Sequence, residues 1–136
     1  MSKGSYVILM RNEKDRIIQV GKRRVYFRKG YYIYCGSHMV NLEKRIKRHF
    51  SRDKKLRWHI DYLTKEMDVL FAIMIRSGKK MECSISRVLC EEFEPYSRLG
   101  ASDCKCKTHV FFSDKKPDLI PLLNDFGEVE YITPSF

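Results

Sequence analysis

The sequence contains no hydrophobic run long enough to cross a membrane. Its longest apolar stretch covers residues 69–75, whereas a membrane-spanning helix needs roughly 20 residues. The first residues do not resemble a secretory signal, because they lead directly into an expected strand. Five cysteines, an odd number, without such a signal indicate reduced thiols. We therefore expect a cytoplasmic protein with no membrane segment.

Internal repeats, low-complexity tracts and linkers are also missing from the sequence. Its 136 residues match one ordinary domain, which is long enough to bury a hydrophobic core without disulfide bonds. Apolar residues make up 43% of the chain and aromatic residues 12%, and these values exclude an intrinsically disordered protein. We expect a single domain over residues 1–136.

Positive charge is abundant and unevenly distributed. The chain has 27 Lys and Arg residues against 17 Asp and Glu residues, a formal net charge of +10. The basic residues concentrate between residues 16 and 57, and the C-terminal third is close to neutral. A positive field of this kind attracts polyanions, of which nucleic acid is the commonest. A basic surface that serves only solubility is the alternative.

Hydrophobic patterning predicts an α+β fold. We expect strands at residues 7–10, 17–20, 25–27, 31–35, 68–76, 108–112 and 129–132. We expect helices at residues 41–50, 81–93 and 117–123, with a short helix or turn at residues 58–63. The short connections between the first four strands favour a small antiparallel β-meander. Helices flank this sheet, and a strand–helix–strand extension follows at the C-terminal end.

The expected helix at residues 41–50 places two polar side chains beside its apolar stripe. The stripe consists of residues at four-residue spacing: Leu42, Ile46 and Phe50. Arg45 and His49 lie about 60° around the helix from that stripe, at the border between core and solvent. Such a position suits groups that project into a cleft. For Arg45 the alternative is a surface ion pair with Glu43 or Asp53.

The expected helix at residues 81–93 carries a carboxylate within its apolar face. Glu82 falls between Leu89 and Phe93 on a helical wheel. A carboxylate there costs several kcal/mol unless a cation or a metal ion meets it. The alternative is that Glu82, in the first helical turn, interacts with the helix dipole or faces outward.

Three short motifs resemble those of the GIY-YIG nuclease superfamily. Gly4-x-Tyr6 opens one strand, Tyr34-x-Gly36 ends another, and Arg45 lies on the following helix. The resemblance extends from Gly4 to about His109 and implies a GIY-YIG-like nuclease domain. It is greatest for a small branch that, in some archaea, is joined to an endonuclease III-like base-excision glycosylase. The motifs shared with that branch are Trp58 to Leu63, Glu82-Cys83 and Ser102 to His109.

The resemblance implies a metal-dependent mechanism. One Mg²⁺ or Mn²⁺ ion would bind Glu82, with waters completing an octahedron, and would stabilise the leaving oxygen. Arg45 would bind a non-bridging phosphate oxygen. Tyr6 would activate or position the attacking water, and Tyr34 would orient it or hold the phosphate. His49 could shuttle a proton, as could His59. The alternative for each tyrosine is core packing.

Basic residues near these motifs are candidates for nucleic-acid contacts. The candidate set is Lys44, Lys47, Arg48, Lys54, Lys55, Arg57 and His59. Plain solvated charge is the alternative for the lysines. Asp61 could orient His59, or it could instead cap a helix. We interpret Trp58 as a packing anchor rather than a platform for stacking a base.

A cysteine and histidine cluster near residue 105 has a second possible chemistry. Four soft ligands for zinc could come from Cys104, Cys106, His109 and either Cys83 or Cys90. The spacing differs from the usual Cys-x-x-Cys pair, so zinc is the less favoured interpretation. Asp103 and His109 lining an active cleft is one alternative, and ordinary buried thiols are the other.

The favoured function is a metal-dependent endonuclease that hydrolyses phosphodiester bonds in DNA, in repair or recombination. The shared branch suggests a functional link to a base-excision glycosylase. A catalytically inactive nucleic-acid-binding module is one alternative. Ser37-His38 stands where the superfamily usually has a lysine or similar polar residue, and the asparagine that many members carry after the glutamate has no clear counterpart. An RNA-directed nuclease is the other alternative.

Overall fold

A computed structural model describes residues 3–96 and 108–134 of the chain. Its strands are β1 (Gly4–Asn12), β2 (Arg16–Val20), β3 (Arg23–Phe27), β4 (Gly30–His38), β5 (Asp68–Arg76), β6 (Glu94–Pro95), β7 (Val110–Ser113) and β8 (Val129–Ile132). Its helices are α1 (Leu42–Phe50), α2 (His59–Glu66), α3 (Glu82–Glu92), α4 (Ile120–Leu123) and the 3₁₀ turn η1 (Asn124–Phe126). The predicted α+β class is confirmed.

Six of the strands form one antiparallel sheet in the order β6-β7-β4-β1-β5-β8. Strand β1 lies inside the sheet and pairs with both β4 and β5. Strands β2 and β3 pair only with each other in the described sheets, as a separate hairpin between β1 and β4 in the chain. The C-terminal strand–helix–strand extension is present, and β7 and β8 add to opposite halves of the sheet.

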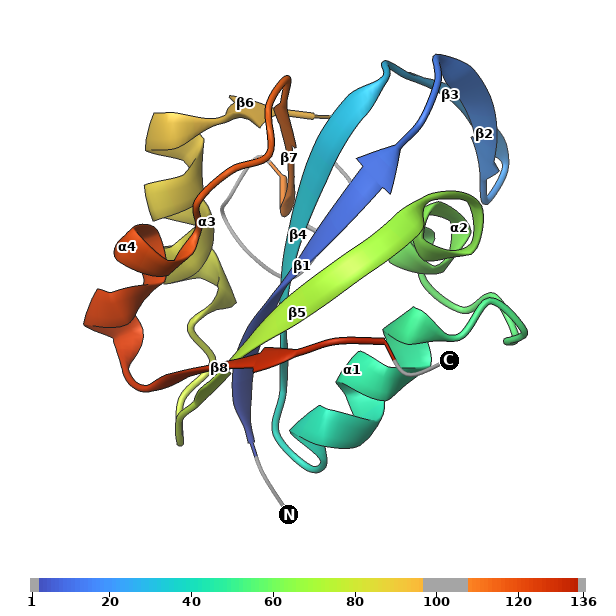
Figure 1. The fold of residues 1–136 in the computed structure, drawn as a ribbon. Helices are drawn as coiled ribbons and strands as arrows, with labels where there is room; N and C mark the ends of the chain where they lie inside the picture. Colours follow the sequence, from blue (N-terminus) through green and yellow to red (C-terminus); the bar gives the residue numbers. More distant parts are fainter. Residues whose placement is uncertain (1–2, 97–107, 135–136) are drawn as a thin grey trace.

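Both faces of the six-stranded sheet are covered, and each has its own hydrophobic core (Figure 1). Side chains alternate between the faces along a strand, so Tyr6 and Ile8 point to one side and Val7 and Leu9 to the other. Helices α1 and α2 and the β2–β3 hairpin cover the Tyr6 side. Helices α3 and α4 cover the Val7 side. This arrangement places helices α1 and α3 on opposite faces of β1.

The predicted helices are present, with some changes of length. Asn41 caps α1 as expected, and its side chain accepts the Lys44 backbone N–H at 3.1 Å. The predicted short helix or turn at residues 58–63 is a longer helix, α2. The predicted helix at residues 117–123 is wrong in its first half, because α4 begins only at Ile120. Pro121 lies in its first turn, where its missing N–H is tolerated.

The cysteines depart from the expectation of reduced thiols. Cys83 is disulfide-bonded, whereas Cys35 and Cys90 are thiols outside any disulfide. The prediction is therefore wrong for Cys83. Cys104 and Cys106 lie outside the described residues. Within residues 3–96 and 108–134, no helix is long and apolar enough to cross a membrane.

Candidate functional site

Two motif glycines allow Tyr6 to occupy the end of the sheet. Tyr6 lies opposite Gly36 in the β1–β4 pairing. A Cβ atom at Gly36 would lie 2.6 Å from the Tyr6 hydroxyl oxygen, closer than any real contact of this kind. Gly4 has a φ of +153°, and a Cβ there would lie 2.1 Å from the Ile75 carbonyl oxygen. The glycines of both motifs are therefore explained by close approach of other groups.

Three aromatic rings meet on the face of the sheet that helix α1 covers. The hydroxyl of Tyr6 lies 2.8 Å from Nε2 of His49, a residue that is only 1% exposed. The ring centroids of Tyr6 and Tyr34 are 6.2 Å apart, and those of Tyr34 and His49 are 6.0 Å apart. The structure thus brings together three of the five predicted catalytic residues by direct contact.

Electrostatic effects connect the other two predicted residues to the same rings. Burial raises the pKa of Tyr6 well above its usual range, and the Arg45 guanidinium opposes that rise. Burial also raises the pKa of Tyr34, as do Tyr6 and the Glu82 carboxylate. Glu82 raises and Arg45 lowers the pKa of both phenols. The charges of Arg45 and Glu82 thus act on the same two phenols, whereas direct contact is found among Tyr6, Tyr34 and His49.

Arg45 is held by an aromatic ring rather than by an acid. Its guanidinium carbon lies 4.3 Å from the centroid of the Trp58 ring, and that of Arg48 lies 4.7 Å from the same centroid. No carboxylate among the described residues is within ion-pair distance of Arg45, and Glu43 instead pairs with Arg76 at 3.7 Å. The alternative of an ion pair with Glu43 or Asp53 is therefore not found. Trp58 is 40% exposed, so it is not the core-packing anchor that was expected, and its ring instead contacts both guanidinium groups.

The first turn of helix α3 fixes the position of Glu82. The Met81 backbone N–H donates to the Ser5 hydroxyl at 2.9 Å, and that hydroxyl lies 2.8 Å from the Ser37 hydroxyl. The thiol of Cys35 donates to the Glu82 carbonyl at 3.6 Å. The Glu82 side chain is half-buried, and no described residue pairs with its carboxylate. The backbone at Glu82 is thus fixed, and no described residue neutralises its carboxylate.

Sequence reasoning missed three polar residues that belong to this region. Ser5 and Ser37 link strands β1 and β4 to helix α3. The pKa of His38 is lowered, first by burial and then by the nearby Arg45 guanidinium. Their positions in the sequence could have indicated them, because Ser5 lies inside the Gly4-x-Tyr6 motif and Ser37-His38 directly follows the Tyr34-x-Gly36 motif.

Two residues predicted to contact nucleic acid are engaged within the fold. Arg48 donates to both carboxylate oxygens of Asp61, at 2.5 and 3.0 Å. Lys54 donates to the Thr64 hydroxyl at 2.6 Å and to the carbonyls of Arg48 and His49, which end helix α1. Burial lowers the pKa of Lys54 to about 8. These contacts fasten helix α1 to helix α2.

The remaining basic candidates lie on the surface. They are Lys44, Lys47, Lys55, Arg57 and His59, all exposed. His59 is near the β2–β3 hairpin, since its Nε2 would lie 3.8 Å from a Cβ atom at Gly21. No structural contact within the described residues assigns it to the cluster of Tyr6, and its role stays a prediction.

Asp61 is fully buried and caps helix α2. Besides Arg48, the backbone N–H groups of Arg57 and Trp58 donate to its carboxylate, at 2.8 and 3.0 Å. Burial alone would raise the pKa of Asp61, but these hydrogen bonds outweigh it and hold the pKa below its usual value. The capping interpretation of Asp61 is therefore confirmed.

The buried His49 should make stability depend on pH. Burial, followed by the Lys54 charge, lowers the pKa of His49 to about 3 from 6.5. The folded state thus binds fewer protons than the unfolded state between these values, and stability is lost as pH falls through that window. From about pH 6 to about pH 4.5, above the usual carboxylate range, we expect this one residue to lower the free energy of unfolding by up to about 1.4 kcal/mol per pH unit.

Urea unfolding of the wild type and of His49→Gln across that range measures the effect. The glutamine can still accept a hydrogen bond from Tyr6 but does not titrate. A smaller pH slope in the variant is the expected result, and equal slopes would contradict it.

Of the residues in the zinc hypothesis, the structure describes His109, Cys83 and Cys90. His109 is buried, and its carbonyl accepts the Cys35 backbone N–H at 3.1 Å. Cys83 is disulfide-bonded and so is not a thiolate ligand in this structure. Within the described part of the chain, no three His, Cys, Asp or Glu side chains are grouped for a metal ion. A zinc site that uses Cys104 and Cys106 stays a prediction.

Comparison with known protein families gives one match. The model of a family described as a domain of unknown function, DUF123, matches residues 5–130. No curated protein and no solved structure matches the chain. The matched region contains Tyr6, Tyr34, Arg45, His49 and Glu82, and it spans nearly all of the sequence. The chain therefore belongs to the DUF123 family.

Proposed function

We propose that this protein is a metal-dependent endonuclease of the GIY-YIG type that hydrolyses phosphodiester bonds in DNA. One observation carries the proposal. A carboxylate without a described cationic partner, Glu82, and a guanidinium without a described acidic partner, Arg45, act on the same two phenols, the buried Tyr6 and the half-buried Tyr34. Opposite charges positioned but left unpaired in one region are typical of sites that bind a charged substrate and a cation.

The donor set fits a hard divalent ion such as Mg²⁺ or Mn²⁺. Mg²⁺ is commonly held by one or two carboxylates, with waters and substrate phosphates as the other ligands. Glu82 supplies one half-buried carboxylate that no described residue occupies. When bound, the ion would stabilise the charge on the leaving oxygen. The hydroxyls of Ser5 and Ser37 hold the helix that presents this carboxylate.

Arg45 and Tyr34 would bind the scissile phosphate. The guanidinium of Arg45 carries a fixed positive charge and lies over the Trp58 ring, 4.3 Å from its centroid, which limits its rotation. Its donors can therefore meet a non-bridging phosphate oxygen without losing much side-chain entropy on binding. Tyr34 is half-buried, its raised pKa keeps its hydroxyl protonated, and it can donate a hydrogen bond to the same phosphate.

Tyr6 would position the attacking water, and His49 would orient Tyr6. Burial makes protonation of His49 about 5 kcal/mol less favourable than in water, since its pKa is about 3 instead of 6.5. His49 therefore stays neutral, and in the tautomer that carries its proton on Nδ1 it accepts the hydrogen bond of the Tyr6 hydroxyl through Nε2. In that arrangement the phenol oxygen can accept a hydrogen bond from the Arg45 side chain, which opposes the rise that burial causes in the pKa of Tyr6, and from a water molecule. His49 is a positioning residue in this scheme.

The net charge of +10 supports a nucleic-acid substrate, and DNA is the favoured one. The family resemblance suggests a role in repair or recombination and a functional link to a base-excision glycosylase. The alternative that a specific feature favours is a catalytically inactive nucleic-acid-binding module. Ser37-His38 replaces the usual residue after the second motif, and His38 lies close enough to Arg45 for the charge to lower its pKa.

A cleavage assay tests the proposal. Labelled branched DNA, linear duplex DNA and single-stranded RNA are incubated with the wild type in Mg²⁺ or Mn²⁺. We expect cutting of DNA, and we expect Tyr6→Phe to lower the turnover rate about 10²-fold or more while DNA affinity stays the same. Phenylalanine keeps the ring packing and removes only the hydroxyl that bonds to His49.

Tyr131→Phe is the matched control, because the Tyr131 side chain is 53% exposed on β8 and packs against Phe71, away from the cluster. DNA binding without cutting in either metal would overturn the enzymatic proposal and support the inactive module. Cutting of RNA alone would support the RNA-directed nuclease. Full activity of Tyr6→Phe would show that the Tyr6 hydroxyl does not position the attacking water.

A further inference from the structure

The proposed site leaves one strongly basic segment of the chain unused. Residues 14–29, which span the β2–β3 hairpin, contain seven basic residues and one acidic residue, a net charge of +6 out of +10 for the whole chain. This segment contributes none of the five proposed catalytic residues. Its basic residues are Lys14, Arg16, Lys22, Arg23, Arg24, Arg28 and Lys29.

The hairpin turns one face to the core and the other to solvent. Ile18 and Phe27 are buried against the main sheet. On the outer face, Ile17 lies opposite Tyr26, and Gln19 lies opposite Arg24. Ile17 is 56% exposed and Tyr26 is 52% exposed. The outer face thus combines exposed apolar surface with positive charge and hydrogen-bond donors.

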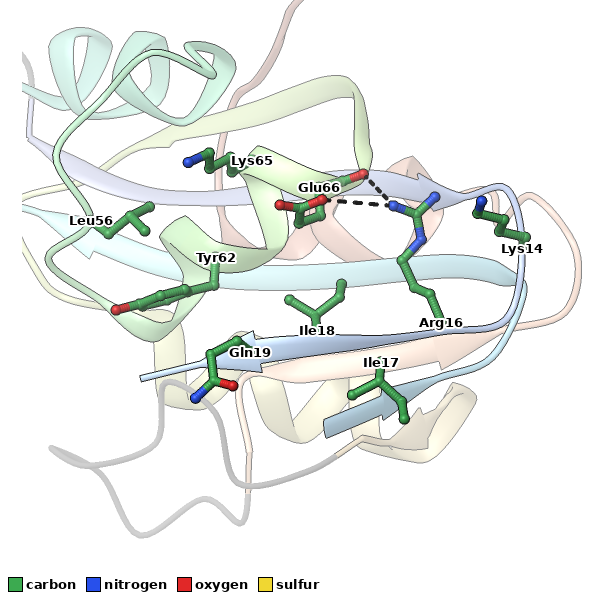
Figure 2. Close-up of a pocket in the computed structure, with 9 residues that line it drawn as sticks. All are labelled: Lys14, Arg16, Ile17, Ile18, Gln19, Leu56, Tyr62, Lys65 and Glu66. Atoms are coloured by element: carbon green, nitrogen blue, oxygen red, sulfur yellow. Dashed lines mark hydrogen bonds and ion pairs between the residues drawn. The ribbon is translucent and has the colours of Figure 1, made fainter. Parts of the chain in front are cut away.

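A groove runs between this hairpin and helix α2 (Figure 2). It has a volume of about 470 Å³, and its lining includes Lys14, Lys65, Tyr62 and Leu56. Arg16 connects the two walls, because its Nη1 donates to the Glu66 carbonyl at 3.2 Å and lies 3.9 Å from the Glu66 carboxylate. The ammonium groups of Lys14 and Lys65 make no hydrogen bond or ion pair with a described residue and so are available to an anion.

Helix α2 connects this groove to the proposed active site. The helix begins directly after Trp58, on which Arg45 stacks, and it ends at Glu66 beside the groove. Its eight residues span about 12 Å, which equals roughly four steps of a duplex along one strand. His59, at the start of the helix, faces Gly21 of the hairpin. A rigid duplex could therefore lie on both surfaces at once.

We propose that the β2–β3 hairpin and its groove with α2 form a second binding site, for the phosphate backbone of the duplex DNA arm beside the scissile phosphate. This inference rests on the proposed function in that DNA is the substrate. The hairpin charge complements the phosphates, and the exposed Ile17 and Tyr26 offer apolar contact to the sugars. The consequence is that a duplex arm, rather than the cleaved strand alone, determines affinity.

Binding of a fluorescent duplex of about 24 base pairs, in EDTA and over a range of salt concentrations, tests this site. For Lys14→Ala/Lys65→Ala we expect about a tenfold higher Kd near physiological salt, and a salt slope smaller by about two, because two phosphate contacts are lost. The matched control is Lys115→Ala/Lys116→Ala. It removes the same charge from the other side of the sheet, where Lys116 lies 6.0 Å from the Phe71 ring.

An unchanged slope in the groove variant, or an equal loss in the control, would overturn the proposal. An equal loss on a single strand of the same length would overturn the assignment to duplex. The measurement needs no metal ion and no turnover, so its failure is distinct from failure of the enzymatic proposal. If the wild type does not cut DNA but the groove variant shows the smaller salt slope, the second site stands without the enzymatic proposal. If the wild type cuts DNA but the groove variant keeps the wild-type salt slope, the second site is absent.

Discussion

Glu82→Gln should lower the rate of DNA cleavage by about 10³-fold while leaving the fold and metal-free DNA binding unchanged. The reason is that glutamine keeps the shape of the side chain but removes the charge that would hold the divalent ion. Glu82 lies at the start of helix α3, where the Met81 N–H donates to Ser5 and the Cys35 thiol donates to the Glu82 carbonyl. The variant should therefore lose function without losing packing. Single-turnover cleavage and Mn²⁺ titration followed by electron paramagnetic resonance measure both effects.

Glu91→Gln provides the matched control on the same helix. Glu91 is exposed near the far end of α3 and contacts none of the proposed site residues. We expect it to retain full activity and Mn²⁺ affinity. A Glu82→Gln protein that cuts at the wild-type rate would show that the carboxylate does not hold the metal ion. Crystals soaked in Mn²⁺ offer an independent check, because the ion should appear beside the Glu82 carboxylate.

Asp61→Ala should destabilise the fold by about 3 kcal/mol and lower the melting temperature by about 10 °C. The substitution leaves the partly buried Arg48 guanidinium without its carboxylate, and it removes the cap of helix α2. Breaking one side of a buried ion pair costs more than the pair itself contributes, because the remaining charge stays desolvated. Differential scanning calorimetry at neutral pH measures the change.

Two further variants separate the causes. Asp53→Ala removes an exposed carboxylate from the neighbouring loop and should change the melting temperature little. The double variant Arg48→Met/Asp61→Leu removes both charges and should recover part of the stability lost in Asp61→Ala. A double variant that is no better than Asp61→Ala would mean that the cap of α2, rather than the unpaired charge, dominates. An Asp61→Ala protein with the wild-type melting temperature would contradict a stabilising role for both the ion pair and the cap.

The sequence allowed the helix of the site to be predicted well because its pattern is local. Leu42 and Ile46 are buried as their spacing requires, and Asn41 caps the helix. Arg45 lies half-buried at the predicted border between core and solvent. His49, predicted at the same border, is fully buried because the Tyr6 hydroxyl, from a strand 43 residues away, satisfies one of its nitrogens. Helical spacing carries no information about such a partner.

Long-range pairing also explains the residues whose contacts were not foreseen. Arg48 and Lys54 look like solvent-facing charges in a basic stretch of sequence. Their partners, Asp61 and Thr64, come from the next helix and convert them into connections between α1 and α2. Similarly, the spacing of short strands predicted the antiparallel sheet, but it could not show that β2 and β3 leave that sheet as a separate hairpin. Whether a hairpin joins the main sheet depends on which of its faces is buried by other elements, and those elements are distant in the sequence.

The alternation of side chains along β1 has a consequence for misfolded molecules. Tyr6 faces one layer of helices, while its neighbour Ser5 bonds to the helix of the other layer that carries Glu82. A slip of β1 by a single residue would exchange these two directions. Such a molecule would lose the phenol and the anchoring of helix α3 together, so an incorrectly assembled chain would lack the proposed cleavage activity.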